Sequence, residues 1–144
     1  MDGVLTMNQE SKGAVIALTE RTVDAGKLDE MACALGTEGS DRTAPLVPFF
    51  GVCIAGEGAV VEVVQADPSR ALLVGHSYRW HRPFRAGETV QVRVYVDDVF
   101  VKGDNEFAIV VAEFTGSDGE PVQTQRSTFI ELPQASGTRT GAKS

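Results

Sequence analysis

The sequence predicts an α+β domain in which a five-stranded antiparallel sheet wraps around one long central helix. Valine occupies every second position from Val90 to Val96, with polar residues between, which is typical of a half-buried strand. Two turn signals, Lys102–Asn105 and Ser117–Glu120, separate successive apolar runs and predict antiparallel hairpins. A third stretch, Pro45–Val64, combines the highest apolar density with an unusual run of small residues. These three features predict a curved sheet closed over a helix.

Length and charge limit the class of protein. A chain of 144 residues has the size of one domain and buries a sizeable core. Its formal charge of −7 argues against nucleic-acid or anionic-membrane partners, because both require clustered cations. The polar start lacks the apolar core of a signal peptide, and no apolar run reaches the length of a membrane span. We expect a cytoplasmic protein that binds neither nucleic acid nor membrane.

The N-terminal third contains a tail, a strand and a short helix. Residues 1–13 are polar and lack periodicity, which predicts a flexible tail. Residues 14–22 begin apolar and turn to alternation, as in a first strand. A helix is expected over Ala25–Leu35, because Asp24 stands at the N-cap position and Gly36 at the C-cap position.

The central helix is expected over Pro45–Val64, beginning near Phe49 because prolines favour an extended entry. Three glycines in a free-standing helix would each cost roughly 1 kcal/mol relative to alanine. The helix must therefore gain stability from close approach to a neighbour. Helical spacing places four small residues on one face: Gly51, Ala55, Gly58 and Ala59.

Four consecutive strands follow the helix, which Asp67-Pro68 closes. Their expected bounds are Leu72–Trp80, Thr89–Val101, Glu106–Phe114 and Val122–Leu132. The domain then spans residues 14–132, and residues 133–144, rich in small polar residues, are expected to be disordered. Cys33 and Cys53 stand among small apolar residues and are interpreted as buried thiols, with a disulfide or metal role as the alternative. We expect no metal and no other cofactor.

One turn carries a resemblance to a known family. The turn His81–Val90 reads His-Arg-Pro-Phe-Arg-Ala-Gly-Glu-Thr-Val, and it lies between Tyr78-Arg79-Trp80 and the strands Asn105–Phe114 and Gln125–Phe129. Together these segments resemble the MaoC-like hot-dog family, and most of all its N-terminal, fatty-acid-synthase-type dehydratase half. The resemblance covers roughly residues 14 to 132 and implies a hot-dog fold. That fold hosts hydratases, dehydratases, thioesterases and non-catalytic halves alike.

The family's catalytic motif is missing from the expected place. Hydratases of this family carry an Asp and a His in an Asp-x-Asn-Pro-x-His motif ahead of the central helix, because hydration of an enoyl thioester needs a group that holds water and one that moves a proton. The corresponding loop, Gly36–Pro48, holds Asp41 but no Asn-Pro, and no histidine precedes His76. The departure predicts no catalysis by this chain alone.

The resemblance therefore implies the non-catalytic, substrate-accommodating subunit of an enoyl-CoA hydratase or 3-hydroxyacyl dehydratase. Its partner would be a catalytic MaoC-like hot-dog subunit, in a heterodimer or a dimer of heterodimers. The substrate would be a long or bulky acyl thioester, lipid-derived or steroid-derived, carried by coenzyme A or acyl carrier protein. Residues expected to line the acyl channel, or else to fill the core, are Phe49, Phe50, Gly51, Ile54 and Gly58.

Other side chains leave alternatives open. Arg82 and Arg85 match the phosphates of coenzyme A as donor forks, or else pair with Glu88 in the turn. Glu57 on the central helix suits a hot-dog acyl-CoA thioesterase, or else forms a hydrogen bond at an interface or faces solvent. His76 is a candidate general base or a structural histidine. An acyl-binding module without catalysis is a third possibility.

Overall fold

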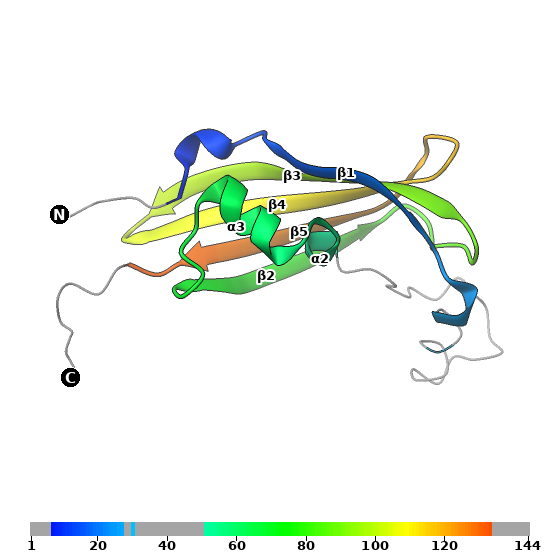
Figure 1. Cartoon of the computed structure of the whole chain (residues 1–144), viewed down its shortest axis with the longest axis horizontal. Helices are drawn as coiled ribbons and strands as arrows, with labels where there is room; N and C mark the ends of the chain where they lie inside the picture. Colours follow the sequence, from blue (N-terminus) through cyan, green and yellow to red (C-terminus); the bar gives the residue numbers. More distant parts are fainter. Residues whose placement is uncertain (1–6, 28–29, 31–50, 134–144) are drawn as a thin grey trace.

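The structure is a computed structural model that describes residues 7–27, 30 and 51–133, apart from the side chains of Val52 and Glu57. One antiparallel sheet dominates it, with the strand order β1-β3-β4-β5-β2 (Figure 1). The elements are η1 (Gln9–Ser11), β1 (Val15–Thr22), α2 (Gly51–Ala55), α3 (Glu57–Val64), β2 (Ala71–Trp80), β3 (Thr89–Lys102), β4 (Asn105–Thr115) and β5 (Pro121–Glu131). None of the described helices is long and apolar enough to cross a membrane.

The five predicted strands are all present, with bounds within two residues of those expected. Alternation in β3 has the expected cause, since Val90, Val92, Val94 and Val96 are fully buried on the face that carries the helices. Both predicted hairpins are antiparallel, with a glycine at positive φ in each turn: Gly103 at 65° and Gly119 at 87°. The core lies between this face of the sheet and the two helices (Figure 1).

The central helix differs from the prediction in being interrupted. Gly56 has φ 90°, and it separates α2 from α3. A glycine adopts this conformation without a Cβ clash, so the run of small residues permits a break that periodicity did not predict. The helix ends at Gln65, whose φ of 58° is left-handed, shortly before Asp67-Pro68 as expected. Its predicted start, from Pro45 to Phe50, lies outside the described residues.

The predicted flexible tail proves shorter than residues 1–13. The side chain of Met7 is only 3% exposed and belongs to the core. The backbone N–H of Met7 donates to Oε1 of Glu106 at 2.9 Å, and that of Asn8 donates to the carbonyl of Val64 at 2.7 Å. One large apolar side chain and two long-range hydrogen bonds thus fix a segment whose sequence has no periodicity. Residues 1–6 and 134–144 are outside the described part.

Two other predictions are only partly covered. Ala25 to Lys27 and Glu30 are helical, and the remainder of the predicted helix, with Cys33, lies outside the described residues. Cys53 is exposed, so its interpretation as a buried thiol was wrong. Gly51 is the residue of α2 that is buried against β4 and β5, and a residue two positions later lies on another side of the helix.

Candidate functional site

The turn His81–Val90 is organised around Arg82, whose side chain is 14% exposed. Its guanidinium donates to both carboxylate oxygens of Glu88, at 2.7 and 3.0 Å, to Oε1 of Glu120 at 2.7 Å, and to the carbonyl of Pro83 at 2.9 Å. Hydrogen bonding to Glu88 outweighs burial and raises the pKa of Arg82. Of the two alternatives given for Arg82, the structure shows the pairing with Glu88, and the guanidinium donates to groups within the protein.

Arg85 differs from Arg82 although both belong to the same turn. Its side chain is 68% exposed, and its nearest carboxylate oxygen in Glu120 lies at 3.8 Å. Its backbone N–H donates to Oε2 of Glu88 at 2.6 Å. Arg85 is thus held by its main chain while its side chain reaches solvent, and its contact with a coenzyme A phosphate stays a prediction.

His76 lies on β2, opposite Ser127 of β5. Its Nδ1 is 2.7 Å from Oγ of Ser127, and its ring meets the ring of Tyr78 edge to face at 4.7 Å. Burial lowers the pKa of His76, which favours the neutral imidazole. Its use as a general base stays a prediction. His81 is exposed, and its backbone N–H donates to the carbonyl of Val122 at 2.9 Å, so it fixes the entry to the turn.

The predicted channel residues do not form one group. Phe49 and Phe50 lie outside the described residues, and the side chain of Glu57, the thioesterase candidate, is not described either. Ile54 is half-buried and packs against the core. The backbone of Gly51 is buried against β4 and β5, where a Cβ would collide with that of Ala112.

Gly58 is exposed, and a Cβ there would meet nothing within 4 Å, so it does not fill the core, and its place in an acyl channel stays a prediction. The break at Gly56 changes the phase of the helix, so that Gly51 and Gly58 no longer share a face.

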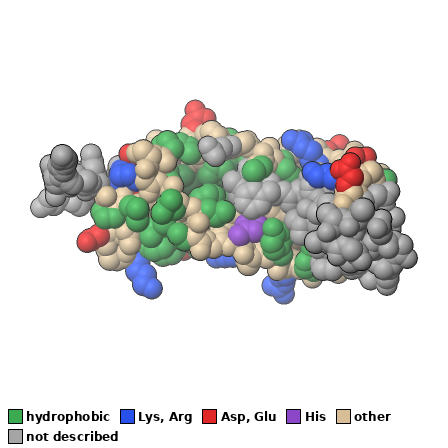
Figure 2. Space-filling view, turned by 90° about the horizontal axis from the view of Figure 1, so that it is seen from below, with side chains coloured by type: hydrophobic (Ala, Val, Ile, Leu, Met, Phe, Trp, Pro, Cys, Tyr) green, Lys and Arg blue, Asp and Glu red, His purple; other side chains and the backbone are tan. Residues whose placement is uncertain are grey.

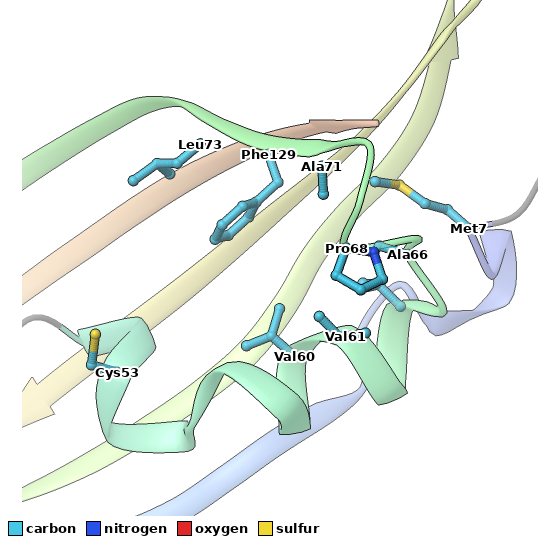
Figure 3. Close-up of a pocket in the computed structure, with 10 residues that line it drawn as sticks. Met7, Cys53, Val60, Val61, Ala66, Pro68, Ala71, Leu73 and Phe129 are labelled. Carbon is cyan, nitrogen blue, oxygen red and sulfur yellow. The ribbon is translucent and has the colours of Figure 1, made fainter. Parts of the chain in front are cut away.

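A cavity that the sequence did not predict lies between the two helices and the sheet (Figure 3). Its volume is about 320 Å³, which falls in the range of small-ligand sites, about 300 to 1,000 Å³. Its lining consists of Met7, Cys53, Val60, Val61, Val64, Ala66, Pro68, Ala71, Leu73 and Phe129. The sequence contains one feature related to this cavity, the small residues Ala66 and Ala71 on either side of the Asp67-Pro68 turn. Their place in its lining depends on tertiary packing, which the sequence pattern does not give.

Two buried carboxylates hold the segments that border this cavity. Glu106 of β4 and Glu131 of β5 are cross-strand partners, 6% and 1% exposed. Glu106 accepts the N–H of Met7, and Glu131 accepts the N–H of Asp67 at 2.6 Å and a guanidinium N–H of Arg70 at 3.2 Å. Burial raises the pKa of Glu131 above its ordinary value. The charges thus fasten the cavity's borders, while its lining stays apolar.

The outer edge of β2 is unusually apolar for an exposed strand. β2 stands at the end of the strand order, with β5 as its one neighbour in the sheet. It carries half of the exposed large apolar side chains found among the described residues: Leu72, Leu73, Val74 and Tyr78, which are 42 to 53% exposed. Figure 2, seen from the side on which β2 lies in Figure 1, shows hydrophobic side chains gathered on this face.

Comparison with known sequences identifies the family of the chain. The family model described as "FAS1-like, dehydratase domain region" matches residues 28–125. A UPF0336 protein of Saccharopolyspora erythraea is 37% identical over 94 residues, which cover 62% of this chain and 59% of that protein. The chain therefore spans less than two thirds of the length of this curated relative.

Comparison with solved structures agrees on the fold. The C-terminally truncated HadBC (3R-hydroxyacyl-ACP dehydratase) complex of Mycobacterium tuberculosis matches with a TM-score of 0.59 and 18% identity, over 88% of this chain and 99% of that one. The ChsH1-ChsH2 complex of the same organism matches with a TM-score of 0.54 and 15% identity, over 83% and 84%. A MaoC-like dehydratase gives 0.62 and 17%, over 88% and 43%. The chain has the hot-dog fold and belongs to the family of FAS1-like dehydratase domain regions.

Proposed function

We propose that this chain is the non-catalytic, substrate-accommodating subunit of a heteromeric MaoC-like enoyl-CoA hydratase or 3-hydroxyacyl dehydratase. The observation that carries the proposal is the composition of the loop Gly36–Pro48, which has no Asn-Pro-x-His segment. The chain has two histidines, His76 and His81, both far beyond that loop in sequence. Because the reaction needs an acid–base pair at the acyl α and β carbons, a second subunit must supply it.

Two of the similar structures are themselves two-component assemblies. HadBC and ChsH1-ChsH2 are named as complexes, and the first is described as a 3R-hydroxyacyl-ACP dehydratase. Similarity to members of such complexes supports a heterodimer, or a dimer of heterodimers, for this chain. It also supports an acyl thioester substrate, with coenzyme A or acyl carrier protein as the carrier.

The open edge of β2 supports pairing with another subunit. An unpaired strand edge offers free backbone N–H and C=O groups, and proteins usually cover or charge such an edge. Here the edge carries Leu72, Leu73 and Val74 instead, each about half exposed. A second hot-dog sheet that adds its own edge to β2 would satisfy the backbone and bury these side chains.

The substrate we propose is a long or bulky acyl group, lipid-derived or steroid-derived, processed in the cytoplasm. The apolar lining of the cavity beside β2 favours such a group over a charged one. Arg85, whose side chain reaches solvent, is the candidate for a carrier phosphate.

The decisive experiment is reconstitution with a catalytic MaoC-like subunit, sought first in the neighbouring reading frame. Loss of enoyl absorbance is measured for crotonyl and longer enoyl thioesters with the chain alone, the partner alone and the pair. We expect no turnover by the isolated chain and turnover by the pair. A control pair carries Asp→Asn in the partner's catalytic motif.

Turnover by the isolated chain, lost in His76→Ala, would overturn the non-catalytic assignment. Release of free thiol from an acyl thioester by the isolated chain, lost in Glu57→Gln, would favour the thioesterase instead.

A further inference from the structure

We infer that the cavity beneath α3 holds the distal end of an unbranched aliphatic acyl chain and that Met7 forms the wall that limits its length. The inference deepens the proposed function and rests on it, because the acyl group is delivered by the thioester chemistry of the pair. It assigns a specificity-determining role to a residue of the N-terminal segment, outside all the channel positions that the sequence indicated.

The chemistry of the lining selects a hydrocarbon. Aliphatic and aromatic side chains provide nearly all of it, and one thiol, that of Cys53, completes it. The carboxylates nearest the borders, Glu106 and Glu131, already accept the backbone N–H groups of Met7 and Asp67. A polar ligand would lose its hydration and gain little in return, and water finds few partners in such a space. A methylene chain gains about fourfold in affinity for each buried CH₂.

The arrangement of the lining favours an extended chain over a fused ring system. Figure 3 shows Leu73, Phe129 and Ala71 along the strands, facing Val60 and Val61 on α3. Two facing rows of apolar side chains enclose a slot along the helix. A chain lying in this slot contacts both rows with successive methylenes.

Met7 lies at the end of the slot that is farthest from Cys53 (Figure 3). Its backbone is fixed on both sides, by the hydrogen bond to Glu106 and by that of Asn8 to Val64. The side chain therefore cannot withdraw through movement of the main chain, and the volume at position 7 sets the depth of the slot. Methionine suits a wall of this kind, since its flexible thioether adapts to a chain end.

The opposite end of the slot reaches the surface where a partner is proposed to bind. Cys53 is exposed there, and Leu73 is 45% exposed and belongs to the open edge of β2. An acyl chain that comes from the partner's catalytic site would cross this edge and run towards Met7. The slot and the pairing surface are thus continuous through Leu73.

The test uses the full chain, with fluorescence of bound cis-parinaric acid displaced by saturated fatty acids from octanoate to octadecanoate. Met7→Ala should deepen the slot and improve binding of an acid two methylenes longer by about fifteenfold. Met7→Trp should shift the preference to shorter acids by a similar factor. Leu18→Ala is the matched control, because it also removes a large apolar side chain, from β1 at a position that is 73% exposed.

A second readout avoids dependence on one substitution. Ala71→Leu fills the slot from the sheet and should shorten the preferred chain even if Met7→Ala proves unstable. Maleimide labelling of Cys53, in a Cys33→Ser background, should slow when dodecanoate is bound. Thermal melts establish that each variant is folded before binding is compared.

The outcomes separate this inference from the proposed function. A reconstituted pair that turns over enoyl thioesters, with a chain-length preference unchanged by Met7→Ala, Met7→Trp and Ala71→Leu, would overturn the inference alone. If a steroid carboxylic acid displaced the probe more strongly than any fatty acid, the claim that the cavity binds an unbranched chain would be wrong. If no pair is active, yet the fatty-acid preference shifts as stated, the slot stands and the hydratase assignment fails.

Discussion

The turn His81–Val90 and the cavity beneath α3 are opposite in chemistry. The turn is fastened by charge, with the donors of Arg82 engaged by Glu88, Glu120 and a backbone carbonyl. The cavity is lined almost entirely by apolar side chains, and the charges near it fasten its borders. The most recognisable motif of the sequence therefore forms a turn held together by ion pairs. The apolar cavity, by contrast, is lined by residues that belong to no motif.

The largest effect is expected when the guanidinium of Arg82 is removed from the turn. Arg82→Met should lower the free energy of unfolding by about 3 kcal/mol, because Glu88, 15% exposed, keeps its charge and loses its guanidinium partner. Chemical denaturation at neutral pH measures the change.

Arg85→Met is the matched control, since it removes the same group from the same turn at a side chain that is 68% exposed. Its effect should stay below about 0.5 kcal/mol. Equal losses in the two variants would mean that the turn is not organised around Arg82.

The second test concerns the fit of α2 on the sheet. Gly51→Ala should destabilise the chain by about 2 kcal/mol, because the added methyl collides with the Cβ of Ala112, which is fixed to the backbone of β4. The N–H of Gly51 also donates to Oε1 of Gln125 at 2.7 Å, so displacement of α2 would stretch this bond.

Thermal and denaturant unfolding of Gly51→Ala, alone and with Ala112→Gly, provide the measurement. Recovery of stability in the double variant is expected, since deleting the opposing methyl restores the space. A neutral Gly51→Ala would show that α2 does not pack closely on β4.

Most of the sheet was predictable because its signals are local. Alternation in β3 records burial of every second residue against the helices, and the glycines of the two hairpin turns take the left-handed conformations that those turns require. The pairing of Arg82 with Glu88 was also foreseen as an alternative, because six residues across a tight turn bring the two side chains together.

The cavity was not predictable, because its borders depend on contacts distant in sequence. Met7 stands in a polar segment without periodicity, and it joins the core through a hydrogen bond to Glu106, 99 residues away. The break at Gly56 removed the helical phase on which Gly58 had been placed in the channel. The small residues differ in their surroundings, since a Cβ at Gly51 would collide with Ala112 and a Cβ at Gly58 would meet nothing within 4 Å, and the sequence pattern did not distinguish the two.

The third test measures how the stability contributed by Glu88 depends on pH. Burial alone would raise the pKa of Glu88, but hydrogen bonds from Arg82 and from the N–H of Arg85 outweigh it and leave the pKa below its ordinary value of 4.5. A carboxylate with a depressed folded pKa contributes stability that is present above the unfolded pKa and is lost as pH falls through the folded one.

Glu88→Gln should therefore cost about 1 kcal/mol at neutral pH, and the difference from the unmodified chain should shrink as pH falls below 4.5. Thermal melts from pH 7 to pH 3 provide the comparison. The raised pKa of Glu131 acts with the opposite sign but is present in both proteins, so it cancels in the difference. If the stability difference between Glu88→Gln and the unmodified chain did not change with pH, Glu88 would stabilise the turn through packing and not through its charge.

The smallest effect is expected on the outer surface of α3. Gly58→Ala should stabilise the chain by about 0.5 to 1 kcal/mol, because alanine restricts the unfolded backbone and its methyl meets nothing within 4 Å. The substitution should leave fatty-acid binding unchanged, since Gly58 does not line the cavity. Denaturant midpoints and displacement titrations on the same preparation measure both quantities. Destabilisation by Gly58→Ala would mean that another group packs over Gly58, as expected if it lined an acyl channel. Stabilisation with unaltered binding would instead place the ligand on the side of α3 that faces the sheet.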